Sequence, residues 1–144
     1  MPPPDWDVLG VIAAGGVLGA LTRFAVSTAW PHEPAAFPWS TLLVNVSGCL
    51  LIGVLMTVVL ELTDPHRLVR PFLGVGVLGG YTTFSTASVE LERMLDAGRG
   101  APALLYLAAS LFGAVAAVWA GTVLARAGER VLSQRPGLGG DPAP

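Results

Sequence analysis

The chain has 144 residues, of which 53% are hydrophobic and only 12% are charged, and its formal net charge is −2. Soluble domains contain about 25% charged residues, so this composition excludes an ordinary soluble domain and indicates a membrane protein. The eight basic residues are all arginines, and they form no cluster that would bind nucleic acid. The single cysteine, Cys49, excludes an internal disulfide.

Four segments with little or no charge are each long enough to cross the hydrocarbon core of a bilayer. We expect a first helix from about Val8 to Ala29 and a second from about Ser40 to Leu60. A third segment starts at Pro71, and a fourth helix is expected from about Pro102 to Leu124. The sequence therefore predicts an all-α membrane protein with four transmembrane helices.

These spans place a four-helix transmembrane domain in residues 1–125, followed by a disordered tail over 126–144 that is rich in proline and glycine. With four spans, both chain ends lie on one side of the membrane. The arginine bias modestly favours cytoplasmic ends, and the nearly balanced short loops also permit insertion in both orientations. The arginines on the side of the ends are Arg67, Arg70, Arg126, Arg130 and Arg135, and those on the other side are Arg93 and Arg99.

The third segment contains an unusual glycine- and hydroxyl-rich stretch, Gly79-Gly80-Tyr81-Thr82-Thr83-Phe84-Ser85-Thr86. A continuous helix from about Leu68 to Leu95 would be about 42 Å long, which is more than a bilayer requires. The glycine pair and the hydroxyl side chains predict a break in this helix at mid-membrane depth. Lipid cannot satisfy the freed backbone groups, so the break has to be buried in protein, line a wet pathway or hold an ion. This pattern points to transport.

Asn45 is the only amide side chain before Gln134, and it falls in the middle of the second predicted span. Thr41 and Gly48 lie on the same helical face. An amide NH2 and a hydroxyl are hydrogen-bond donors, which a dehydrated anion needs. The alternative is that Asn45 only hydrogen-bonds to a neighbouring helix.

Tyr106 and Ser110 lie four residues apart on the fourth helix, as Thr41 and Asn45 do on the second. A tyrosine that anchors at the membrane interface and a serine that only packs would give the same pattern. Phe84 is either a lipid-facing or core residue, or a ring whose positive edge can stabilise a small anion. Arg23 either reaches the headgroups or forms a cationic vestibule that attracts anions. Glu90 lies close enough along the chain to touch a pathway at Phe84, or it is simply neutralised by its neighbour Arg93.

No nucleophile–base pair, phosphate loop or metal-binding cluster is present in the sequence, so we expect no enzyme activity. His32 and His66 fall in predicted loops and are expected to be solvated. Glycines such as Gly15 and Gly19 recur along the helices at spacings typical of close packing. Four thin helices enclose little space, so we expect an oligomer, most simply a dimer.

Three segments together resemble the Fluc fluoride channels, also called the CrcB family. They are Gly15 to Phe24, Thr41 to Gly48, and Gly79 to Thr86, in the order found in that family and within a chain of similar length. The resemblance covers nearly the whole chain except the tail. It implies an antiparallel dual-topology homodimer in the bacterial plasma (inner) membrane, with two pores along the subunit interface. It also implies passive export of fluoride, which lowers the fluoride concentration in the cytoplasm.

The resemblance also implies roles for particular residues. Asn45 matches the pore asparagine, Phe84 the first pore phenylalanine, and Arg23 a vestibule arginine. Glu90 matches a carboxylate near the pore. The polar residues implied along the fluoride pore are Thr41, Ser85, Thr86, Tyr106 and Ser110. The backbone carbonyls implied to hold a central structural sodium ion are those of Gly79 and Thr82.

Two positions depart from the family pattern. Ala87 stands where a second phenylalanine is expected, and Ala114 where a second serine is expected. The chain therefore either conducts with fewer anion ligands or forms a heterodimer with a related subunit that supplies them. Alternatives are a non-conducting subunit and a small multidrug antiporter. The antiporter is disfavoured because the first span contains Arg23 and no acidic residue.

Overall fold

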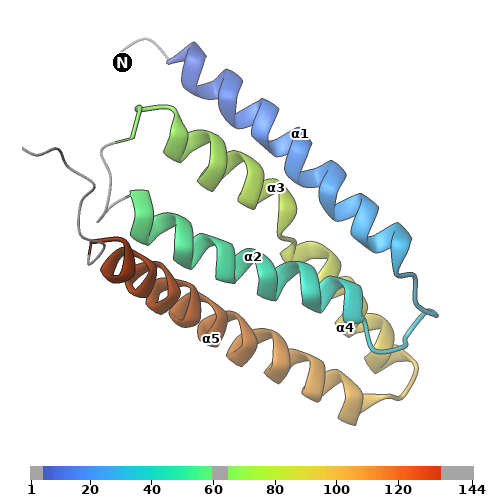
Figure 1. The fold of residues 1–144 in the computed structure, drawn as a ribbon. Coiled ribbons are helices and arrows are strands. Elements are labelled where there is room, and N and C mark those ends of the chain that lie inside the picture. Colours follow the sequence, from blue (N-terminus) through green and yellow to red (C-terminus); the bar gives the residue numbers. More distant parts are fainter. Residues whose placement is uncertain (1–4, 60–64, 134–144) are drawn as a thin grey trace, which may run out of the picture.

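The structure is a computed structural model that describes residues 5–59 and 65–133, and all regular elements within these ranges are helices. They form four rods that lie side by side, as Figure 1 shows, and this confirms the all-α prediction. The elements are α1 (Trp6–Ala29), α2 (Trp39–Thr57), the π-helix η2 (Pro71–Leu78), α3 (Gly79–Tyr81), α4 (Phe84–Asp96) and α5 (Gly100–Ser133).

Three of the rods contain helices that are long and apolar enough to cross a membrane. These stretches are Trp6–Ala29, Trp39–Thr57 and Gly100–Val131. The fourth predicted span corresponds to the third rod, which consists of η2, α3 and α4 in succession. Its longest piece, α4, has 13 residues and is too short to cross a bilayer alone.

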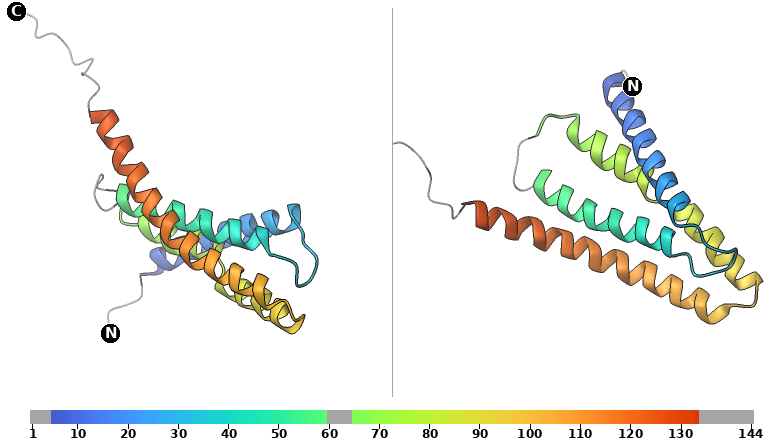
Figure 2. Two further views of the ribbon diagram at one scale, coloured as in Figure 1. Left: turned by 90° about the horizontal axis from the view of Figure 1, so that it is seen from below. Right: turned by 45° about the vertical axis from the view of Figure 1, so that its right-hand side comes forward.

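The predicted end of the second helix at Leu60 lies outside the described residues; α2 ends at Thr57, and residues 58–59 continue it as π-helix. One other helix end differs from the sequence prediction. Helix α5 continues to Ser133, so the prediction of a disordered tail is wrong for residues 126–133. Alanine, arginine and glutamate in that stretch favour helix and outweigh Gly128, whereas the first proline of the tail is Pro136. The end of α5 projects beyond the other rods (Figure 2), and residues 134–144 lie outside the described part.

Glycines allow the rods to pack backbone against backbone. A Cβ atom added at Gly19 of α1 would overlap the carbonyl oxygen of Val77, and one added at Gly80 would overlap the oxygen of Gly16. Helices α2 and α5 approach each other in the same way, at Gly53 and Gly121. The small residues predicted to pack closely therefore do so, and they bring the middle of the third rod directly against α1.

We predict that Gly19→Ala destabilises the fold by about 1–3 kcal/mol, because the new methyl group meets backbone atoms that cannot move aside. The measurement is the thermal midpoint of the purified protein in detergent, followed by tryptophan fluorescence. Gly10→Ala on the same helix is the control, since a Cβ there has nothing within 4 Å. Equal midpoints for the two variants would contradict this packing.

Candidate functional site at the interrupted helix

The third rod is interrupted by two residues in extended conformation. Thr82 has φ −74° and ψ 157°, and Thr83 has φ −148° and ψ 121°, between the helical residues Tyr81 and Phe84. In a continuous helix the Thr83 N–H would donate to the carbonyl of Gly79. The interruption redirects that N–H and leaves the last carbonyls before it without their helical donors.

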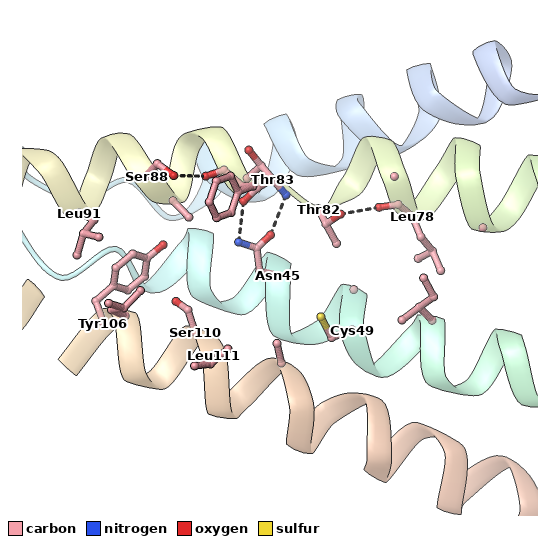
Figure 3. A pocket seen from close by; sticks show the side chains of 18 residues that line it. Asn45, Cys49, Leu78, Thr82, Thr83, Ser88, Leu91, Tyr106, Ser110 and Leu111 are labelled. Carbon is pink, nitrogen blue, oxygen red and sulfur yellow. Dashed lines mark hydrogen bonds between the residues drawn. The ribbon is translucent and has the colours of Figure 1, made fainter. Parts of the chain in front are cut away.

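Asn45 of α2 pairs with the interrupted backbone through both ends of its amide. Its Nδ2 donates to the carbonyl oxygen of Thr83 over 2.8 Å, and the Thr83 N–H donates to Asn45 Oδ1 over 2.8 Å. Figure 3 shows both bonds. The amide thus replaces a peptide partner that the helix no longer provides. An NH2 group has two hydrogens, so one N–H of Asn45 remains available as a donor.

Further hydrogen bonds stabilise each side of the interruption. The Thr82 hydroxyl donates to the Leu78 carbonyl over 3.0 Å, and Arg23 Nη1 of α1 donates to the Thr82 carbonyl over 3.2 Å. The Thr83 hydroxyl accepts the N–H of Thr86 over 3.2 Å and so caps the start of α4. Thr83 is not among the site residues predicted from the sequence. A threonine directly before a helix is a typical N-cap, and this signal could have identified it.

A cavity of about 540 Å³ lies beside the interruption, between the third rod, α2 and α5. Figure 3 shows Asn45, Tyr106 and Ser110 around it. The cavity brings together four residues that the sequence predicts in a pore, namely Asn45, Phe84, Tyr106 and Ser110. The other described lining residues are mostly apolar, and they include Ala87 and Ala114.

Two buried hydroxyl groups in this cavity have no hydrogen bond of normal length and angle among the described residues, although they lie near enough to interact with each other. They are the Tyr106 OH and Ser110 Oγ. Tyr106 is only 2% exposed and packs edge-on against Phe37, with ring centroids 5.6 Å apart, so it is not an exposed interfacial anchor. A buried polar atom without a partner costs about 1–3 kcal/mol, which makes these two atoms candidates for contact with a ligand.

A second cavity of about 170 Å³ lies between α1, α2 and the start of α4. Arg23, Thr41 and Thr86 line it, whereas the larger cavity does not include them. The predicted polar residues are therefore divided between two cavities, and Thr83 lines both. Ser85 lines neither, and its hydroxyl lies 3.4 Å from that of Thr83.

Glu90 of α4 is a buried carboxylate, only 6% exposed. Arg93 Nη1 lies 3.6 Å from its Oε1, as the spacing of the two residues predicted. His32 Nε2 lies 3.8 Å from the same oxygen, and the His32 side chain is 20% exposed. His32 is therefore only partly solvated, contrary to the expectation from the sequence, because the loop between α1 and α2 folds back onto α4.

The acidic residues and histidines that the structure describes do not form a metal site. Within the described residues no group of three or more histidine, cysteine, aspartate or glutamate side chains could hold a metal ion. Backbone carbonyls are the other possible cation ligands. Gly79 is exposed and its carbonyl has lost the donor of a continuous helix, while the Thr82 carbonyl accepts one bond, from Arg23.

Together, the fold and the site define a helical membrane protein of the transport class, with a rod interrupted beside a cavity that contains unpartnered hydroxyls. Residues 10–122 match the family described as CrcB-like protein, Camphor Resistance (CrcB). The chain belongs to this family.

Curated relatives cover most of the chain. A protein of Nocardia farcinica named fluoride-specific ion channel FluC 2 is 51% identical over 88% of this chain and 90% of its own length. A FluC 2 protein of Thermobifida fusca is 51% identical over 88% of this chain and 97% of its own length. A FluC 2 protein of Streptomyces avermitilis is 51% identical over 72% of this chain and 66% of its own length. Ion channels are not a class of enzymes.

We predict that Asn45→Leu loosens the interruption, because it leaves the Thr83 N–H without its partner and removes one hydrogen bond from the Thr83 carbonyl, at about 1–3 kcal/mol for the buried N–H. Hydrogen exchange followed by mass spectrometry should show lost protection in peptides that contain Thr83. Thr122→Val is the control, because its hydroxyl bonds only to the Val118 carbonyl of its own helix. Unchanged protection in Asn45→Leu would show that Asn45 does not hold the backbone there.

Proposed function

We propose that the chain is a subunit of a fluoride-selective channel of the bacterial plasma (inner) membrane, which lets fluoride leave the cytoplasm passively. The names of the relatives support the substrate. The observation that carries the proposal is the pair of buried, unpartnered hydroxyls of Tyr106 and Ser110 in the same cavity as the Asn45 amide.

Neutral donors suit the passage of a strongly hydrated anion. Fluoride must lose water to enter a narrow path, so the protein has to offer hydrogen-bond donors in its place. None of the described residues that line the larger cavity is charged, and neutral ligands avoid trapping the ion. The ring of Phe84, which is 87% exposed, can add its positive edge to this set.

Arg23 would attract anions toward the interruption. It lines the smaller cavity with Thr41 and Thr86, and a cationic group in a cleft raises the local concentration of anions. Because Thr83 lines both cavities, this arginine would act on the other side of the interrupted backbone from Asn45.

A second protomer is needed to complete the site. Gly79 and Phe84 are exposed on either side of the interruption, and a lone protomer would present freed backbone groups there to lipid. Lipid cannot satisfy such groups, so another protein surface must cover them at mid-membrane depth. We infer an antiparallel dual-topology dimer, in which the two interrupted rods face each other.

A structural sodium ion fits the carbonyls at this interface. The Gly79 carbonyl has lost its helical donor, and the Thr82 carbonyl retains one free lone pair beside its bond to Arg23. Two protomers would offer four such oxygens, and a bound monovalent cation would neutralise their partial charges and hold the two rods together.

The second candidate function is that of a subunit that needs a related partner chain. Ala87 and Ala114 line the larger cavity and contribute only methyl groups to it. A partner with an aromatic and a hydroxyl residue at these positions would complete the ligand set. An antiporter is disfavoured, because the only acidic residue of α1 is Asp7, which lies in the first turn of the helix and pairs with Arg67.

We predict that the purified chain releases fluoride, but not chloride, from liposomes, and that Asn45→Asp reduces the rate to that of protein-free liposomes. The substitution replaces a donor by an anionic acceptor that faces the Thr83 carbonyl. A fluoride electrode measures the efflux, and Thr122→Val is the control expected to retain the wild-type rate. Wild-type efflux in Asn45→Asp would rule out the assigned role. Silence of the wild-type chain alone would favour the partner-dependent subunit.

We also predict that sodium stabilises the dimer. Replacing an organic cation by roughly 100 mM Na+ should raise the thermal midpoint, because a ligand that binds only the native state adds to its stability. Potassium, which is larger, should have a smaller effect. The same midpoint in all three salts would exclude a structural sodium ion.

A further inference from the structure

The loop between α1 and α2 contacts the segment that joins α4 to α5 and the first turns of α5. Arg99 Nη1 donates to the Ala35 carbonyl over 2.7 Å, and Phe37 packs edge-on against Tyr106. His32, in the same loop, reaches the carboxylate of Glu90. This loop therefore packs against Tyr106, which lines the larger cavity.

The Glu90 carboxylate is incompletely neutralised. Its Oε1 lies 3.6 Å from Arg93 Nη1 and 3.8 Å from His32 Nε2, distances that allow attraction but exceed those of strong charge-assisted hydrogen bonds. Its Oε2 is buried and has no hydrogen-bond partner within the described parts of the chain. A neighbouring positive charge stabilises such a carboxylate more than it would stabilise an exposed one, because burial reduces screening by solvent and salt.

We propose that protonation of His32 changes the charge beside the ion path and so makes the fluoride flux depend on pH. This inference rests on the proposed function. When the imidazole is protonated, it pairs with Glu90 and changes the charge of the His32–Glu90–Arg93 cluster from neutral to positive. None of these three side chains lines the larger cavity, but the cluster neighbours it, since Leu91 of α4 lines it and Phe37 of the same loop packs against Tyr106. Added positive charge beside the cavity would raise the local concentration of anions. Fluoride flux should therefore increase as the pH falls.

The other groups near the cluster do not provide this response. The Nδ1 atom of His32 lies 3.3 Å from the backbone oxygen of its neighbour Glu33, whose side chain is in the exposed loop. Arg99 donates to the Ala35 carbonyl, and Arg93 is the guanidinium already paired with Glu90. Tyr106 of α5 packs against Phe37 of the same loop. Histidine is the side chain whose charge ordinarily changes between pH 5 and 8.

The first experiment measures fluoride efflux from liposomes with the same pH inside and outside, at about pH 5.5 and about pH 7.5. Protein-free liposomes provide the background of hydrogen fluoride that crosses lipid directly. We expect wild-type efflux to rise about two- to fivefold at the lower pH, and His32→Gln to lose this rise. His66→Gln, at an exposed histidine outside the cluster, should retain it. If His32→Gln keeps the wild-type pH profile, the inference is overturned while the proposed function stands.

The second experiment does not depend on conduction. Thermal midpoints of the wild type, His32→Gln, Glu90→Gln and the double variant are compared at about pH 5.5 and about pH 8. A charged pair predicts that His32→Gln lowers the midpoint at the lower pH only, and that this loss disappears when Glu90 is already replaced. Absence of pH-dependent coupling overturns the inference. If coupling is found but no fluoride flux under any condition, the proposed function fails, and with it the link of this pair to an ion path.

Discussion

The site depends on one interaction, the paired hydrogen bonds between the Asn45 amide and the backbone of Thr83. An interrupted helix in an apolar environment is costly unless each freed N–H and carbonyl finds a partner. The amide satisfies one of each, and it does so from a neighbouring helix. It therefore also fixes the position of the third rod against α2 and, through this contact, the shape of the larger cavity.

The polar groups of the site fall into two kinds with different consequences. The hydroxyls of Thr82 and Thr83 are used by the chain itself, one to close the helix before the interruption and one to cap the helix after it. The hydroxyls of Tyr106 and Ser110 have no partner within the described residues and face the cavity. The first kind maintains the interruption, and under the proposed function the second provides donors for an anion. A member of the CrcB-like family can thus hold an irregular backbone and still keep binding capacity.

Much of this arrangement could be predicted from the sequence, because apolar spans and breaks follow from local composition. Helix α1 ends at Ala29, as expected, and two extended residues lie within the glycine- and hydroxyl-rich stretch. Other features could not be predicted in this way. The extension of α5 to Ser133 could not be predicted from the overall composition of residues 126–144, because helix-favouring residues at its start are followed by a segment rich in proline and glycine. His32 was expected in water because a loop sequence does not reveal which helix the loop folds against.

The sequence by itself determined the helical class, the approximate spans, the position of the interruption and the identity of the polar residues, since each of these depends on neighbours along the chain. Only the tertiary structure decided which of those residues share a cavity. It separated Thr41 and Thr86 from Asn45 and joined Asn45 to Tyr106 and Ser110. The physical reason is that glycine contacts between rods set the distances and rotations of whole helices, and no local pattern records where a side chain points once two helices have packed.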